Sequence, residues 1–300
     1  MSQNRRFRLI VPFPPGGSTA YTADALVRLM DAAQGPRLTV DYRLGEFGIP
    51  ALQELGSDRE GSVLMLGTVT THAITPVLYA DRLATGTEQA ARPVSRVATF
   101  PAVVITHRDC AEDTLRGFLG RLQAGDGTLT FGTDFLGSHV DADAIALGEV
   151  AALKVKYRAA NGANRILADL IDHRIDLAFL NVATAAANVG RYRPLAVTAP
   201  RRLPNFPGVP TMAEAGYPGI GTANWQGLFA SSAVADDTVA HLYEATVAAL
   251  RSPAAREAFA RVDADITPSA SRNAFAAEVR AEQQGWRALM PKILALQEAS

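Results

Sequence analysis

The chain has 300 residues, of which 48% are hydrophobic and 20% are charged, and its formal net charge at pH 7 is −1. This composition is that of a globular protein large enough for one large domain or two medium-sized ones. The near-neutral charge argues against a nucleic-acid-binding protein, which carries a surplus of basic residues. Cys110 is the single cysteine, so an intramolecular disulfide is excluded and the redox compartment stays open.

The predicted elements alternate along the chain between strands and helices. Short runs rich in β-branched residues predict strands, and apolar stripes at helical spacing, such as Leu26, Leu29 and Met30, predict helices between them. Alternation of this kind indicates an α/β fold with largely parallel sheets. The strands are expected at Arg8–Val11, Leu38–Tyr42, Val63–Leu66, Ser95–Phe100, Val103–Thr106, Thr128–Phe131, Val155–Tyr157, Leu177–Leu180, Leu195–Thr198 and Gly227–Ser231.

Several predicted strands end in small or hydroxyl-bearing residues immediately before a helix. Ligands of open parallel sheets bind outside the carboxyl ends of the strands, where helix N-termini present unpaired N–H groups. Glycine lets a ligand approach the backbone, and Ser and Thr add donors without bulk, so these segments predict an anion site without lysine. The alternative is that the hydroxyls only cap helices. The segments are Pro14–Thr19, Gly67–His72, Gly132–His139 and Asn181–Thr184.

Other chemistries find little support in the sequence. The motifs of P-loop, α/β-hydrolase and zinc-peptidase sites are absent, and the five histidines lack metal-ligand spacing, so no cofactor or metal is expected. The longest apolar runs are too short to span a bilayer. No secretory leader is recognisable, because the first apolar stretch runs directly into a strand and loop. Two alternatives therefore remain: the protein is cytoplasmic, or its leader was replaced.

Six segments, in order, resemble the substrate-binding proteins of tripartite tricarboxylate transporters, also called Bug-type receptors. The resemblance covers nearly the whole chain. The most specific segment is similar to the family pattern L-A-V-T-x-x-x-R-x-x-x-x-P-x-V-P-T-x-x-E-A-G. The segments are "LIVPFPPGGST", "LMLGTVTTHAITPVLY", "LTFGTDFLGSH", "VKYRAANGANRILADLIDHRIDLAF", "RPLAVTAPRRLPNFPGVPTMAEAGYPG" and "WQGLFA".

The resemblance implies a type II periplasmic-binding-protein fold, in which two α/β lobes close on a ligand. By analogy, lobe one is residues 1–101 plus 225–300, and lobe two is residues 102–224. The implied function is capture of a small carboxylate in the periplasm and delivery to membrane transporter subunits, by a monomer that is not an enzyme. The alternatives are a ligand-sensing receptor, or an enzyme on the same fold that uses His72 or His139 as a base.

The resemblance also assigns roles to the residues of the candidate site. In lobe one, Gly16 and Gly17 expose backbone N–H groups to a carboxylate, and Phe13 forms an apolar wall. The hydroxyl and imidazole groups expected on this lobe are those of Ser18, Thr19, Thr68, Thr70, Thr71 and His72. The residues expected to approach from lobe two are Thr133, Asp134, Ser138, Asn161 and Asn181.

Four departures from the family pattern bear on the ligand. Ala20 stands where Asp is frequent, residues 42–48 replace a glycine-rich stretch, Asp134 and Phe135 replace small residues, and Arg158 stands where Lys is common. If the carboxylate of Asp134 points to the ligand, it favours an ammonium group; if it caps the following helix, the ligand is a plain carboxylate. Capping is the commoner fate of such a residue, so we expect a carboxylate without an amino group.

Overall fold

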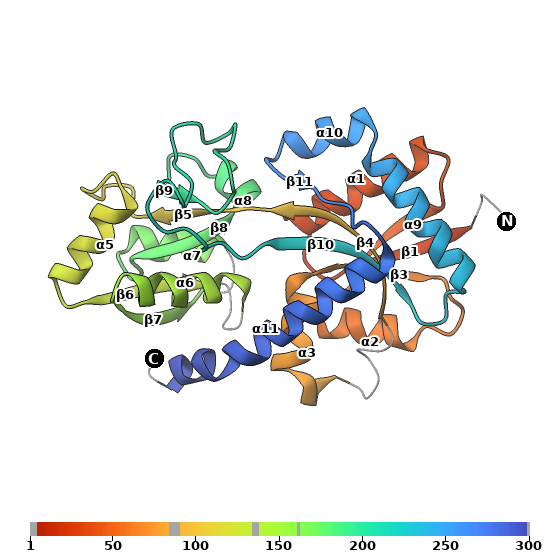
Figure 1. Ribbon diagram of the computed structural model, residues 1–300, viewed down its shortest axis with the longest axis horizontal. Helices are drawn as coiled ribbons and strands as arrows, with labels where there is room; N and C mark the ends of the chain where they lie inside the picture. The colour runs from red at the N-terminus through yellow and green to blue at the C-terminus, as the bar shows by residue number, and fades with distance from the viewer. Residues whose placement is uncertain (1–4, 84–90, 134–137, 161–162, 299–300) are drawn as a thin grey trace. The chain divides into compact units, whose positions relative to one another are not determined.

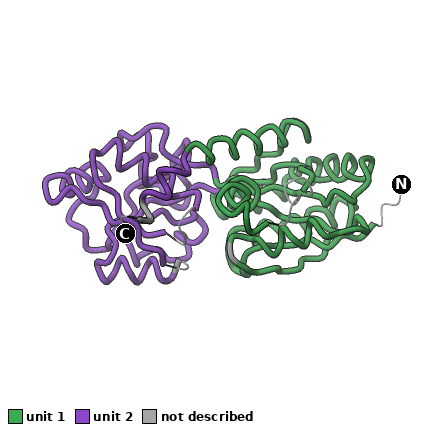
Figure 2. Tube along the Cα trace, turned by 90° about the horizontal axis from the view of Figure 1, so that it is seen from below, with its two compact units in different colours: residues 1–99, 224–288 green, residues 100–223, 289–300 purple. Residues whose placement is uncertain are grey.

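The computed structural model describes residues 5–83, 91–133, 138–160 and 163–298. The chain divides into two compact units, which Figure 2 distinguishes by colour. Unit 1 comprises Met1–Thr99 and Asn224–Ala288, and unit 2 comprises Phe100–Ala223 and Leu289–Ser300. The last of these segments was expected in lobe one. That the units act as two halves of a ligand clamp stays a prediction.

Unit 1 is built on a mixed sheet whose parallel part lies at one side (Figure 1). In the described part of this unit, six strands follow the order β11-β4-β10-β3-β1-β2. β1 pairs in parallel with β2 and β3, whereas β10 runs antiparallel to β3, and β11 antiparallel to β4. The carboxyl ends of β1, β2 and β3 therefore meet at one sheet edge. The strands are β1 (Arg6–Val11), β2 (Arg37–Tyr42), β3 (Val63–Thr68), β4 (Ala91–Phe100), β10 (Asn224–Ser231) and β11 (Asp265–Ile266).

The helices of unit 1 bury the two faces of this sheet. β3 reads VLMLGT and is buried along its whole length, as expected for a central strand covered on both sides. Phe7, Leu9, Leu26 and Phe229 are fully buried in the core of this unit. The helices are α1 (Ser18–Ala32), η1 (Glu46–Gly48), α2 (Ile49–Ser57), η2 (Thr70–Ile74), α3 (Thr75–Leu78), η3 (Ala80–Arg82), α9 (Asp236–Leu250), α10 (Pro253–Ala260) and α11 (Arg272–Glu298), whose last part belongs to unit 2.

Unit 2 has a second mixed sheet with the order β7-β6-β8-β5-β9 among its described residues. β6 pairs in parallel with β7 and β8, and β5 runs antiparallel to β8 and β9. Phe118, Phe131 and Phe179 form part of its apolar core. The elements are β5 (Ala102–Thr106), α5 (Leu115–Ala124), β6 (Thr128–Thr133), α6 (His139–Val150), β7 (Lys154–Ala159), α7 (Ala163–Ile171), β8 (Leu177–Asn181), α8 (Val182–Ala186) and β9 (Arg193–Val197).

The architecture confirms the predicted α/β class, and each of the ten strands expected from the sequence overlaps an observed one. The expectation of largely parallel sheets is wrong for the strands β4, β5, β9 and β10, because antiparallel pairing does not change the hydrophobic pattern of a buried strand. The two-residue strand β11 was not expected. A strand this short gives no period from which to predict it.

Candidate functional site

The loop between β1 and α1 presents bare backbone at the N-terminus of a helix. Residues 14–17 are exposed, and Phe13 is half-buried. Gly16 has φ +91, a conformation that L side chains rarely adopt, so the turn requires glycine here. A Cβ atom on Gly16 would meet nothing within 4 Å, and one on Gly17 would meet only the carbonyl oxygen of Pro14 at 3.9 Å. The space over both glycines is therefore open to a ligand.

Helix α1 begins without a capping side chain. Gly17 is its N-cap residue and has no side chain that could accept a hydrogen bond from the first turn. The first intrahelical bond runs from the N–H of Tyr21 to the carbonyl of Gly17 at 3.0 Å, so the N–H groups before it have no intrahelical acceptor. The dipole of this 15-residue helix adds a partial positive charge at the same place. These features favour binding of an anionic oxygen.

A glutamine that the sequence analysis did not single out holds the hydroxyl groups of this loop. Nε2 of Gln226 lies 3.0 Å from Oγ of Ser18 and 3.5 Å from Oγ1 of Thr19. Gln226 is fully buried in β10, where it pairs with Thr68 of β3. It occupies the variable position of the W-x-G-L-F-A pattern, so the sequence alone gave no signal for it.

In the second candidate segment, at the end of β3, the two threonines Thr68 and Thr71 bond to each other. The backbone N–H of Thr68 donates to Oγ1 of Thr71 at 2.9 Å, and the N–H of Thr71 lies 3.3 Å from Oγ1 of Thr68. Oγ1 of Thr71 is also 2.8 Å from Nδ1 of His72. These side chains and that of Thr70 are buried. Direct contact of these hydroxyls with ligand stays a prediction.

His72 is a packing residue of unit 1. Its ring stacks on Phe229 with centroids 3.6 Å apart, and it covers Gly67, where a Cβ atom would come within 2.3 Å of the imidazole. Burial lowers the pKa of His72 to about 3. A general base titrates near the working pH, so the lowered pKa of His72 does not favour that role. His139, at the start of α6, is half-buried, and burial lowers its pKa to about 4.

The burial of His72 predicts a loss of stability in acid. The folded pKa of about 3 lies below the ordinary histidine pKa of 6.5, so the unfolded chain binds a proton that the folded protein excludes. The free energy of unfolding should therefore fall by up to roughly 1.4 kcal/mol per pH unit from pH 6.5 downward. Urea unfolding of the native protein and of His72→Gln measures this, and the variant should show a shallower slope. An NMR titration midpoint of His72 above pH 5 would contradict the prediction.

Three segments of unit 1 converge at this sheet edge. A Cβ atom on Gly48 would lie 2.5 Å from Cγ2 of Thr71 and 3.3 Å from Cβ of Pro12, so Gly48 is in contact with both neighbouring segments. The preceding residue, Phe47, has φ +57 and stacks on Tyr79 with centroids 3.9 Å apart. Phe47, within the residues that depart from the glycine-rich pattern, is thus one member of a half-buried aromatic pair with Tyr79.

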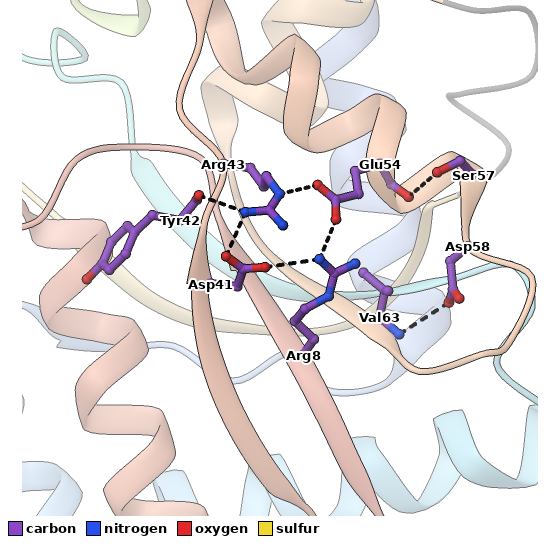
Figure 3. A network of polar contacts seen from close by, with 8 residues as sticks. All are labelled: Arg8, Asp41, Tyr42, Arg43, Glu54, Ser57, Asp58 and Val63. Carbon is purple, nitrogen blue, oxygen red and sulfur yellow. Dashed lines mark hydrogen bonds and ion pairs between the residues drawn. The ribbon is translucent and has the colours of Figure 1, made fainter.

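A charge-balanced network anchors the chain that leads to Gly48 (Figure 3). Arg8 of β1 pairs with Asp41 of β2 at 3.0 Å and with Glu54 of α2. Arg43 pairs with the same two carboxylates, at 2.7 Å from Asp41. Two guanidinium groups and two carboxylates leave no net charge in this network. It therefore fixes the end of β2 and supplies no cation to the site.

In unit 2, three candidate residues form local capping bonds. Oγ of Ser138 is 2.9 Å from Oγ1 of Thr133, and the hydroxyl and N–H of Ser138 donate to the carboxylate of Asp141 at 2.9 and 3.1 Å, in a capping box of α6. Asn181 is the N-cap of α8, and its Oδ1 accepts from the N–H of Ala183 at 3.0 Å. Asp134 and Asn161 lie outside the described residues. Ligand contacts of this group stay a prediction.

Arg158, one of the departures from the family pattern, has a structural partner. It donates from Nε to the carboxylate of Asp169 at 3.0 Å. Asp169 also pairs with Arg165 and Arg174 at 3.2 and 2.8 Å, and its side chain is 1% exposed. Asp176 likewise holds the fold, since it accepts from the backbone N–H of Thr130 at 2.7 Å. These charges stabilise unit 2.

The described part of the chain lacks two features of other protein classes. In that part, no helix is long and apolar enough to cross a membrane. Within the same residues, no three His, Cys, Asp or Glu side chains come together as a metal site would require.

Comparison with known proteins gives one consistent family. Protein BugT of Bordetella pertussis (strain Tohama I) is 28% identical over 285 residues, which cover 92% of this chain and 86% of BugT. A Rhodopseudomonas palustris protein with adipate has a TM-score of 0.82 and 24% identity, covering 97% of both chains. MatC of R. palustris with bound malate has a TM-score of 0.77 and 22% identity, covering 95% of this chain and 98% of MatC.

The two structural likenesses confirm the bilobal periplasmic-binding-protein fold expected from the sequence. Residues 34–293 match the sequence model of the family described as tripartite tricarboxylate transporter family receptor. That match spans most of both units and includes the segments at the carboxyl ends of β3, β6 and β8. The chain therefore belongs to the tripartite tricarboxylate transporter receptor family and is a solute-binding protein.

Proposed function

We propose that this receptor binds a small carboxylate without catalytic turnover and delivers it to the membrane subunits of a tripartite tricarboxylate-type transporter. The observation that carries the proposal is the uncapped N-terminus of α1 behind the exposed glycines Gly16 and Gly17. The family match and the structures with malate and adipate support the same class of ligand. We further propose a periplasmic location and a monomeric receptor, as the family resemblance implies.

The proposed ligand carries no ammonium group. The donors of unit 1 at this edge are backbone N–H groups and hydroxyls, and the neighbouring carboxylates, Asp41 and Glu54, are each paired with Arg8 and Arg43. An ammonium group in such surroundings would lack a counter-charge, and burying it would be unfavourable. The contribution of unit 2, where Asp134 is expected to cap a helix, stays a prediction.

The test is isothermal titration calorimetry of the native protein with succinate, malate, adipate and aspartate. We expect saturable binding of at least one of the three plain acids and weaker binding of aspartate. Mass spectrometry of the acids after incubation should recover them chemically unchanged. Tighter binding of aspartate would refute the choice of ligand class. Turnover that disappears in His139→Ala would refute the receptor function and support the enzyme alternative.

A further inference from the structure

Gln226 is buried in unit 1 with half of its hydrogen-bonding capacity unused. Its side chain is 0% exposed, and Nε2 approaches the hydroxyls of Ser18 and Thr19 at 3.0 and 3.5 Å. Oε1 is shielded from solvent and has no hydrogen-bond partner among the described residues. A buried carbonyl oxygen without a donor destabilises a fold. Packing alone would be served better by an apolar side chain of the same length.

The position of Gln226 connects the unpaired amide to the candidate site. β10 pairs with β3 so that Gln226 lies opposite Thr68, the last residue of β3. The side chain reaches the first turn of α1, which follows the neighbouring strand β1. Gln226 thus lies at the sheet edge where Gly17 and the uncapped turn of α1 are located.

The direction of the bond from Gln226 decides what the Ser18 hydroxyl can do. Nε2 carries only hydrogens, so Oγ of Ser18 accepts from it. A hydroxyl that accepts in this way uses its single hydrogen to donate to a further acceptor. With the amide reversed, Oε1 would take that hydrogen, and the hydroxyl would present lone pairs instead. The amide orientation therefore sets whether the loop recognises acceptors or donors.

We propose that Gln226 is a positioning residue that turns the Ser18 and Thr19 hydroxyls into donors toward a ligand carboxylate oxygen. The inference rests on the proposed function and deepens it, because it names the residue that selects carboxylate over ammonium at this loop. The unpaired Oε1 is then a stability cost retained for function. Gln226 itself touches no ligand, since it has no exposed surface.

Two substitutions test the inference. Gln226→Met keeps the length and removes both polar ends, so the unfolding temperature of the ligand-free protein should equal or exceed the native value, while affinity for adipate or malate falls about fivefold. Gln226→Glu offers only acceptors to the hydroxyls and should weaken binding more than tenfold. In a Ser18→Ala background, Gln226→Glu should lower the affinity less than threefold, because the hydroxyl through which the substitution acts is absent. Gln53→Glu, an exposed glutamine of the same unit, controls for added charge.

The outcomes separate this inference from the proposed function. A lower unfolding temperature of Gln226→Met shows a structural glutamine and overturns the inference, whether or not any acid binds. Native affinity in Gln226→Glu shows that the amide accepts from the hydroxyls, which also overturns it. If Gln226→Glu lowers the affinity equally in the native and the Ser18→Ala backgrounds, the effect comes from the added charge, and the inference is overturned. If the native protein binds none of the acids, the proposed function fails, and an increased unfolding temperature of Gln226→Met still supports a retained stability cost at this loop.

Discussion

Gly17→Val is expected to abolish carboxylate binding and leave the fold intact. Gly17 has φ −90 and ψ 176, an extended conformation open to any residue, and its Cβ position is 3.9 Å from the nearest atom. The folded protein therefore has room for the side chain, and we expect its stability to change by less than about 1 kcal/mol. The isopropyl group would stand over the N–H groups that we propose receive the anion, so the affinity should fall at least about 100-fold, roughly 3 kcal/mol.

Calorimetry with the tightest-binding acid and thermal unfolding measure the two effects of Gly17→Val. Gly208→Val is the matched control, because Gly208 is exposed in unit 2 and a Cβ atom there meets nothing within 4 Å. Gly16→Ala would be a poorer choice, since φ +91 adds backbone strain of about 1 kcal/mol to any effect on binding. Binding of Gly17→Val within threefold of native would show that the anion is held elsewhere.

Asp169→Asn is expected to lower the free energy of unfolding by about 2 kcal/mol, measured by urea denaturation. The buried carboxylate receives three guanidinium groups, and its neutral isostere leaves them with mutual repulsion. Removing one partner of a buried ion pair costs about 3–5 kcal/mol. We take a lower figure because the arginines are 42–56% exposed and keep part of their hydration.

The control for Asp169→Asn is Asp172→Asn. Asp172 pairs with Arg174 at 2.6 Å, but its side chain is 47% exposed, so the loss should stay below about 0.5 kcal/mol. An equal effect of the two substitutions would contradict the special role of the buried carboxylate.

The contribution of Asp169 should depend on pH. Burial alone would raise the pKa of Asp169, but the hydrogen bonds from Arg158 and Arg174 outweigh it and hold the pKa below 3.8. The stabilisation is therefore present above pH 3.8 and is lost as the pH falls through the folded pKa. The difference between native protein and Asp169→Asn should accordingly shrink in acid.

Sequence reasoning located the strands because a buried strand is recognisable from its own residues. β3 and β8 are continuous apolar runs, and Ser252 caps α10 as its hydroxyl-proline pair predicts. Strand direction was harder to predict, because the hydrophobic pattern of β5 or β10 is the same in either orientation. Pairing depends on connections between segments far apart in the chain.

The site was harder to predict, because polar groups at strand ends can either contact a ligand or form hydrogen bonds within their own segment. The hydroxyls and amides of Thr71, Ser138 and Asn181 were proposed to face the ligand, and the structure shows each in a bond to its own segment. These bonds agree with the alternative interpretation, in which the polar groups cap their own segments. Contact of the same groups with a ligand stays a prediction. Gln226 was missed because its partners, Ser18 and Thr19, are more than 200 positions away in the sequence.

The central place of β10 in the sheet of unit 1 has a consequence for synthesis on the ribosome. β3 and β4 both precede unit 2 in the chain, and the strand that joins them, Asn224–Ser231, follows it. Until β10 emerges from the ribosome, β3 and β4 each expose an edge that lacks its partner strand. Another chain can pair with such an edge. Unit 2 draws most of its length from the uninterrupted stretch Phe100–Ala223, so most of it can fold before β10 emerges from the ribosome. A nascent chain stalled with Ala223 outside the exit tunnel and β10 still inside it should therefore show protease resistance in the Phe100–Ala223 stretch and protease sensitivity in the N-terminal segment.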